Sequence, residues 1–149
     1  MALDVTQLEL SPFGMNCYVV RRPGAREAVV VDPGWPGEIV RIEEGLEGGR
    51  FAAILITHAD IDHIGGVAEL QRATHAPVYM AEVDSDRAQR INELYPEAGV
   101  TFEAFTPDVL LQGDEGIAEL REWIANGRAR YRELGGREII GFGLFLFER

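Results

Sequence analysis

The chain reads Thr57-His58-Ala59-Asp60-Ile61-Asp62-His63-Ile64-Gly65-Gly66 directly after an apolar run at residues 52–56. Within six positions this stretch offers four side chains that can bind a metal ion, which are His58, Asp60, Asp62 and His63. Two of the three histidines of the chain lie here. A short apolar run is typical of a buried strand, so the sequence predicts a ligand cluster where that strand ends.

The spacing of these four side chains indicates two neighbouring half-sites. Imidazole nitrogen and carboxylate oxygen both bind zinc at ~2.0–2.2 Å, and catalytic zinc usually keeps three protein ligands and one position for water. His58 and Asp60 are two residues apart, so on an extended segment they point to the same side. Asp62 and His63 are adjacent, and they can share a site only if the chain turns into a helix there.

A helix cap is the simpler interpretation of part of this stretch. Asp60 or Asp62 would then cap a helix that begins near Ile61, with His63 in its first turn. Capping accounts for one aspartate and not for four polar residues together, and a cap and a ligand can coexist. The pair Gly65-Gly66 would let helix and strand backbones approach closely, or would leave room for a bound ion.

Patterns on either side of this stretch predict alternating strands and helices. The expected elements are strands at 16–20 and 27–31, a helix at 37–46, a strand at 52–57, a helical face from 64 to 70 and a strand at 77–80. Such βαβ alternation predicts an α/β fold with layers of helix and sheet.

Three residues outside the stretch have separate interpretations. His75, between the helical face and the next strand, is predicted to be an ordinary loop histidine. Cys17 cannot form an internal disulfide and is expected to be a small buried residue of a strand. The polar stretch 82–97 is predicted to form a mostly helical excursion over the site, with Tyr95 as a candidate for lining a substrate pocket.

The stretch resembles the signature of the metallo-β-lactamase-fold hydrolases, Thr-His-x-His-x-Asp-His-x-Gly-Gly, and matches it everywhere except at position 60. The resemblance covers about residues 6–115. It implies the N-terminal half of an αββα sandwich. This family includes lactamases, glyoxalase II-type thioesterases, lactonases and nucleases, so the resemblance indicates the fold better than the substrate.

The resemblance also implies a role for each polar side chain. His58 would bind a first metal, with Asp60 in the place of that metal's second histidine, while Asp62 and His63 would bind a second metal. Asp32, in the turn after residues 27–31, would lie near the metals without binding them, although a simple turn aspartate is an equally open interpretation. Zinc is the first expectation, and the harder carboxylate at position 60 also accepts iron or manganese.

With a complete ligand set, the implied reaction is metal-assisted hydrolysis of an ester, thioester or lactone bond in a small-molecule substrate. Two cations would lower the pKa of a bridging water and polarise the carbonyl, and Asp62 would orient the nucleophile as the catalytic residue. The downstream ligands of the family are absent, because no histidine follows His75. An impaired hydrolase, a catalytically inactive relative and a metal-binding or interaction module therefore all stay open.

The resemblance divides the chain into a partial domain at 1–115 and a divergent tail at 116–149, expected to form a helix and then an apolar strand. A truncated or frameshifted reading frame, a short homologue with a divergent end, and a half-protein that assembles with a partner are the three explanations of this tail. One half of the sandwich would leave an apolar sheet face bare. We expect the tail or a second copy of the chain, as in a homo-oligomer, to cover it.

Charge and hydropathy exclude two classes of partner. The net charge of −11 argues against a nucleic-acid surface, because phosphate binding depends on clustered cations. A membrane span needs about 20 apolar residues, and the apolar run near the end of the chain is shorter. The first residues lack a signal segment, so a cytoplasmic protein is expected.

Overall fold

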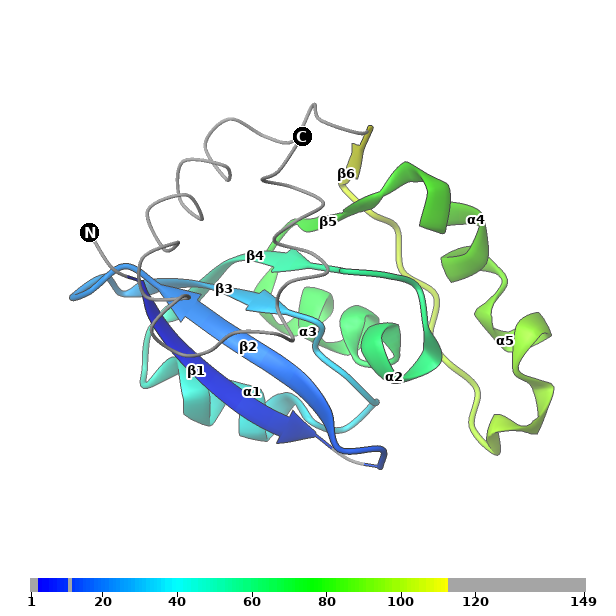
Figure 1. Ribbon diagram of the computed structural model, residues 1–149, viewed down its shortest axis with the longest axis horizontal. Helices are drawn as coiled ribbons and strands as arrows, with labels where there is room; N and C mark the ends of the chain where they lie inside the picture. The colour runs from blue at the N-terminus through cyan, green and yellow to red at the C-terminus, as the bar shows by residue number, and fades with distance from the viewer. Residues whose placement is uncertain (1–2, 11, 113–149) are drawn as a thin grey trace.

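A computed structural model of the chain describes residues 3–10 and 12–112, and these residues contain one six-stranded sheet (Figure 1). Its strands are adjacent in chain order, which is β1 (Asp4–Leu10), β2 (Met15–Arg21), β3 (Glu27–Val31), β4 (Arg50–Leu55), β5 (Val78–Ala81) and β6 (Val109–Leu111). The first three strands pair antiparallel, and β3 to β6 run parallel. The prediction of an α/β fold is confirmed.

Helices connect the parallel strands. They are α1 (Ile39–Leu46), α2 (Ile61–Ile64), α3 (Val67–Thr74), α4 (Glu82–Gln89), α5 (Ile91–Leu94) and a short 3-10 helix, η1 (Pro96–Ala98). Figure 1 shows α1, α2 and α3 along one face of the sheet, whereas α4 and α5 extend beyond the end at which β5 and β6 lie. Parallel strands need such crossover connections, which explains the βαβ order.

The core lies mainly between the sheet and the first three helices. Val30 of β3 and Ile54 of β4 are fully buried there against helix residues such as Ile42 and Leu70. The alternate residues of the same strands, with Val29 and Leu55 among them, are buried on the other face. Strands apolar on both faces are typical of parallel sheets, because both faces of such sheets are covered.

The structure changes the predicted boundaries in two places. The helical face predicted from 64 to 70 belongs to two helices, α2 and α3, with Gly65 and Gly66 between them. The strand β1 had no predicted counterpart, although Leu8 and Leu10 alternate with polar residues in it. The predicted tail at 116–149, the domain boundary at 115 and the covering of the sheet face lie outside the described residues.

A close contact between two turns positions the polar stretch. The turn after β3 contains Asp32 and Gly34, whose φ angles are 52° and 77°. Gly34 N–H donates to the carbonyl oxygen of His63 at 3.2 Å, and Gly66 N–H donates to that of Gly34 at 2.7 Å. The polar stretch is therefore fixed directly against the turn that carries Asp32.

Among residues 3–10 and 12–112, we find no helix with the length and apolar character that a membrane crossing requires.

Candidate metal centre

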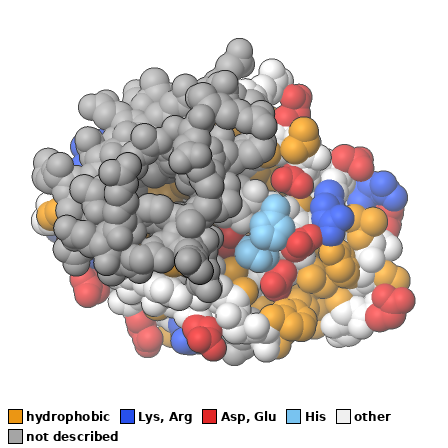
Figure 2. Space-filling model, viewed as in Figure 1, with side chains coloured by type: hydrophobic (Ala, Val, Ile, Leu, Met, Phe, Trp, Pro, Cys, Tyr) orange, Lys and Arg blue, Asp and Glu red, His pale blue; other side chains and the backbone are white. Residues whose placement is uncertain are grey.

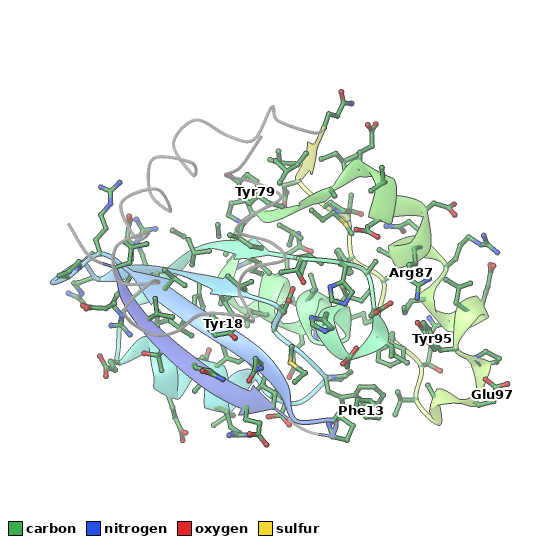
Figure 3. All side chains as sticks on the ribbon, viewed as in Figure 1. Phe13, Tyr18, Tyr79, Arg87, Tyr95 and Glu97 are labelled. Atoms are coloured by element: carbon green, nitrogen blue, oxygen red, sulfur yellow. The ribbon has the colours of Figure 1, made fainter. Side chains whose placement is uncertain are left out.

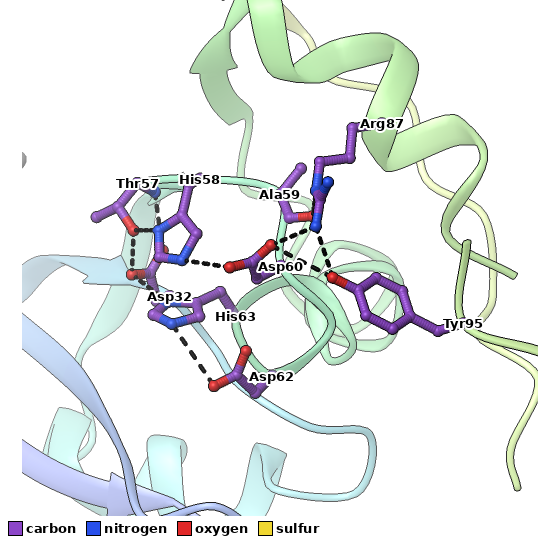
Figure 4. Close-up of polar contacts among 9 residues, drawn as sticks. All are labelled: Asp32, Thr57, His58, Ala59, Asp60, Asp62, His63, Arg87 and Tyr95. Atoms are coloured by element: carbon purple, nitrogen blue, oxygen red, sulfur yellow. Dashed lines mark hydrogen bonds and ion pairs between the residues drawn. The ribbon is translucent and has the colours of Figure 1, made fainter. Parts of the chain in front are cut away.

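The four predicted ligands lie at the carboxyl end of β4, next to the carboxyl end of β3 (Figure 4). The strand ends at Leu55, the chain bends at Thr57, Asp60 is extended, and α2 begins at Ile61. Asp60 occupies the position before the first helical residue, but its side chain makes no capping hydrogen bond. The simple cap interpretation of Asp60 therefore fails, and its carboxylate is available for other contacts.

Asp32 is a buried carboxylate that connects this stretch to β3, and its residue surface is only 4% exposed. Its Oδ1 accepts a hydrogen bond from the Thr57 N–H at 2.8 Å. Its Oδ2 accepts from the Thr57 hydroxyl at 2.6 Å and lies 2.8 Å from His63 Nδ1. Asp32 is thus both a turn residue and a direct partner of one predicted ligand.

These bonds determine which ring nitrogen of each histidine carries a proton. A hydroxyl has a single proton, and Thr57 donates it to Asp32, so the contact of 2.9 Å between Thr57 Oγ1 and His58 Nδ1 requires His58 to be the donor. His63 Nδ1 likewise donates to Asp32. In the neutral ring the other nitrogen is an acceptor, so both histidines present the lone pair of Nε2.

Each of these Nε2 atoms faces a carboxylate oxygen. His58 Nε2 lies 3.2 Å from Asp60 Oδ2, and His63 Nε2 lies 3.7 Å from Asp62 Oδ2. The two imidazole rings are 4.0 Å apart at their centroids. Two facing lone pairs repel unless a proton or a cation lies between them. Ligands of one tetrahedral zinc ion are about 3.3–3.6 Å apart. The separations of 3.2 Å and 3.7 Å lie just below and just above that range, and the chemistry of each pair, an imidazole nitrogen with a carboxylate oxygen, suits a divalent cation.

The described residues supply these ligands as two pairs. Within them, no group of three or more His, Cys, Asp or Glu side chains could hold a metal ion. The predicted grouping into two half-sites agrees with the pairs His58 with Asp60 and Asp62 with His63. Their binding of metal stays a prediction.

The surroundings of His63 attract positive charge. Burial lowers the pKa of His63, but the hydrogen bond to Asp32 together with the negative charges of Asp32, Asp62 and Asp60 outweighs burial and raises this pKa above its ordinary value. Figure 2 shows histidine side chains, in pale blue, at the surface with acidic and basic side chains beside them. The negative charges around His63 that favour a proton on its ring would equally favour a metal cation bound at Nε2.

Arg87 is a functional candidate that the sequence analysis missed. It belongs to α4, and its Nη2 lies 2.7 Å from Asp60 Oδ1 and 2.5 Å from Tyr95 Oη. Figure 3 shows Arg87 and Tyr95 on the same side of the molecule. The excursion at 82–97 is therefore helical and contacts the site, as predicted. In the sequence, the carboxylate at position 60, where the family has a histidine, is the feature that could have indicated a nearby cation. That Tyr95 lines a substrate pocket stays a prediction.

His75 lies apart from these groups, as the sequence predicts. It is exposed and ends α3 in a left-handed conformation with a φ of 56°. Its N–H donates to the carbonyl oxygen of Gln71 at 2.8 Å. This histidine serves the end of a helix and is no part of the candidate centre.

The comparisons with known proteins establish the family. The family model described as "Metallo-beta-lactamase superfamily" matches residues 10–127 of this chain. The chain therefore belongs to the metallo-beta-lactamase superfamily. This agrees with the α/β fold and with the place of the polar stretch at the end of β4.

Curated relatives match part of the chain. A "Probable polyketide biosynthesis zinc-dependent hydrolase BaeB" from Bacillus velezensis is 35% identical over 92 residues, which are 59% of this chain and 40% of that protein. A "Hydroxyacylglutathione hydrolase" from Bdellovibrio bacteriovorus is 41% identical over 76 residues, which are 48% of this chain and 29% of that protein. The matched regions thus cover less than half of each relative.

Solved structures of the same fold include two at 29% identity. The BLEG-1 B3 metallo-beta-lactamase has a TM-score of 0.65, and the match covers 77% of this chain and 56% of that one. The protein TTHA1623, crystallised in a di-iron-bound form, has a TM-score of 0.63, with coverage of 76% and 57%. These likenesses agree with the layered sheet and helices of Figure 1.

Cys17 lies outside the candidate chemistry, and its environment gives a direct prediction. Its side chain is fully buried in β2, and burial, with a smaller effect from the charge of Asp32, strongly raises the pKa of the thiol. Because the thiolate is the reactive form, we expect the native protein to react with a thiol reagent such as DTNB at least about 100-fold more slowly than the unfolded chain. The unfolded chain, which has a single cysteine, should release one equivalent of chromophore. Rapid reaction of the native protein would contradict the buried position.

Proposed function

We propose that this chain is a metal-dependent hydrolase of small-molecule substrates with an ester, thioester or lactone-type bond. The observation that carries the proposal is that the Nε2 atoms of His58 and His63 each lie beside a carboxylate oxygen, at 3.2 Å and 3.7 Å. The names of two relatives, a probable zinc-dependent hydrolase and a hydroxyacylglutathione hydrolase, support it. The chain matches only part of those proteins, so their whole activities are carried over here as a proposal.

Zinc is the metal that we propose first. Each pair supplies one histidine nitrogen and one carboxylate oxygen, and both are ligands that zinc accepts. Iron is the next candidate, supported by the di-iron form of one structural relative, and manganese suits carboxylate ligands as well. When bound, the metal would supply Lewis acidity and a lowered pKa for a bound water.

The residues of the chain have separate tasks in this proposal. His58 and His63 supply Nε2, while Asp60 and Asp62 supply Oδ2. Asp32 keeps the rings in the tautomer that binds metal, directly for His63 and through the Thr57 hydroxyl for His58. Loss of a hydrogen-bond partner of this kind usually lowers metal affinity by ~10–100-fold.

Asp62 is the proposed catalytic residue. Its side chain is 27% exposed, so one side of the carboxylate faces His63 and another is open to solvent. A carboxylate in this position can accept a hydrogen bond from an attacking water and orient it toward the substrate carbonyl. We propose that orientation of the nucleophile is its role.

Elemental analysis of the full chain, purified without a histidine tag, tests metal binding. We expect zinc, iron or manganese at about half an equivalent or more, because the fold already holds each histidine beside its carboxylate partner. Less than about a tenth of an equivalent after incubation with each metal would overturn the proposal. Hydrolysis assays with an aryl ester, a thioester and a lactone, compared with protein stripped by a chelator, then identify the bond.

A second candidate is a family member that folds without turning over substrate. The ion pair between Arg87 and Asp60 favours it, because the guanidinium already satisfies one oxygen of a predicted ligand. A truncated or frameshifted reading frame would predict the same behaviour. Metal binding without metal-dependent hydrolysis of all three substrate types would support this candidate.

A further inference from the structure

Arg87 contacts Asp60, and three acceptors fix the position of its guanidinium (Figure 4). Its Nε donates to the carbonyl oxygen of Ala59 at 3.0 Å. Its Nη2 donates to Asp60 Oδ1 at 2.7 Å and to Tyr95 Oη at 2.5 Å. The guanidinium carbon also lies 5.8 Å from the centre of the Tyr95 ring. Two of the three acceptors are outside the Asp60 side chain, so Arg87 keeps its place without depending on Asp60 alone.

The two oxygens of the Asp60 carboxylate therefore have different neighbours. Oδ1 accepts the charge-assisted bond from Arg87, and Tyr95 Oη lies 3.5 Å from it. Oδ2 faces His58 Nε2 at 3.2 Å. A carboxylate can bind a cation through one oxygen or through both. The guanidinium occupies one lone pair of Oδ1 and repels a cation from that side, so Oδ2 is the oxygen open to a cation.

We propose that Arg87 is a positioning residue that restricts Asp60 to one metal-binding oxygen and thereby sets the metal preference of the centre toward zinc and away from manganese. The inference rests on the proposed function, because it requires a cation beside His58 and Asp60. Zinc is usually four-coordinate, whereas manganese prefers six ligands that are mainly oxygen. A second oxygen from Asp60 would consequently help manganese more than zinc.

The ratio of the manganese and zinc affinities separates the number of oxygens that Asp60 offers from the general repulsion of cations by the guanidinium. The guanidinium repels every divalent cation to a similar extent, so its removal changes both affinities through charge in the same direction. The number of oxygens that Asp60 offers affects the two cations differently. The ratio of the manganese Kd to the zinc Kd is therefore the quantity that reports on the position of Asp60.

The experiment is a competition titration of the metal-free full chain with Zn²⁺ and with Mn²⁺ against a chromophoric chelator. In Arg87→Ala, we expect the ratio of the manganese Kd to the zinc Kd to fall about tenfold, in the range that partners of metal ligands usually show. Arg90→Ala is the matched control. Arg90 lies at the end of the same helix and pairs with Glu93 and Asp86 on the exposed surface, so the control should keep the wild-type ratio.

Tyr95→Phe is the second variant, because it removes one acceptor of the guanidinium without changing any charge. We expect the ratio to fall in the same direction, by about threefold, since Arg87 is then held less firmly. Circular dichroism checks the fold of each variant. If Arg87→Ala fails to fold, Tyr95→Phe decides, and an unchanged ratio in it overturns the inference.

Failure of this inference differs from failure of the proposed function. A ratio in folded Arg87→Ala that stays within about twofold of wild type, with both metals bound, overturns only the role of Arg87. Absence of zinc, iron and manganese binding from the wild type and from every variant overturns the proposed function, and the inference with it.

Discussion

Alanine at position 65 is expected to destabilise the fold by about 3 kcal/mol, the upper end of the usual cost of overpacking a core. A Cβ atom at Gly65 would lie 2.8 Å from Pro36 Cδ, 2.9 Å from Phe102 Cε1 and 3.1 Å from the carbonyl oxygen of Ile61. The φ of Gly65 is −60°, so the backbone itself tolerates alanine. The cost is therefore steric, and it comes from two rings and a backbone atom that cannot move aside easily.

Urea denaturation followed by circular dichroism measures this loss. Gly45→Ala is the control, because a Cβ there meets mainly the flexible end of Leu8, at 3.3 Å. Gly45 lies inside α1, where alanine is favoured over glycine by up to ~1 kcal/mol. We expect Gly45→Ala to be neutral or slightly stabilising. Equal losses from both substitutions would show that crowding at Gly65 is not the cause.

The same glycine shows what the sequence could and could not decide. The pair Gly65-Gly66 predicted either a close backbone approach or room for an ion. The structure decides for close approach, because a Cβ at Gly66 would also lie 3.0 Å from the carbonyl oxygen of Pro33. That contact joins two turns that are 33 residues apart, and no local pattern contains it.

The parallel part of the sheet was predictable because its strands are apolar on both faces. The runs in β3, β4 and β5 and the helical spacing in α1 are local signals, and each of these elements lies within two residues of its predicted bounds. The strand β1 was missed because polar residues alternate with Leu8 and Leu10, and a short alternation of this kind is a weak signal. Its identity as a strand comes from pairing with β2.

The sequence predicted which residues form the candidate centre. It did not predict which of their atoms lie next to one another. The spacing of His58, Asp60, Asp62 and His63 marked them as ligands, but not which atoms face one another. The contacts of Thr57 and His63 with Asp32 depend on the parallel pairing of β3 with β4. The contact of Arg87 with Asp60 depends on the path of α4. Tertiary structure alone brings these groups together.

Removal of His63 is expected to have the largest effect on metal binding. In His63→Ala the side chain that provides Nε2 is lost, and the carboxylate of Asp62 keeps no partner nitrogen. We expect zinc affinity to fall by about 100-fold or more, which exceeds the usual effect of losing a partner of a ligand. The fold should survive, because Asp32 keeps two hydrogen bonds from Thr57. Equilibrium dialysis with Zn²⁺ and circular dichroism measure the two quantities.

Two further variants separate a ligand from a residue that orients one. His75→Asn is the control, because asparagine tolerates the left-handed conformation of that exposed position, and it should bind zinc like the wild type. Asp32→Asn keeps the shape of the side chain but cannot accept all three hydrogen bonds through carboxylate oxygens. Its zinc affinity should fall by ~10–100-fold, less than in His63→Ala. If His63→Ala and His75→Asn bound zinc equally well, then His63 would not be a ligand, and the raised pKa of its ring would reflect only its ion pairs with Asp32 and Asp62.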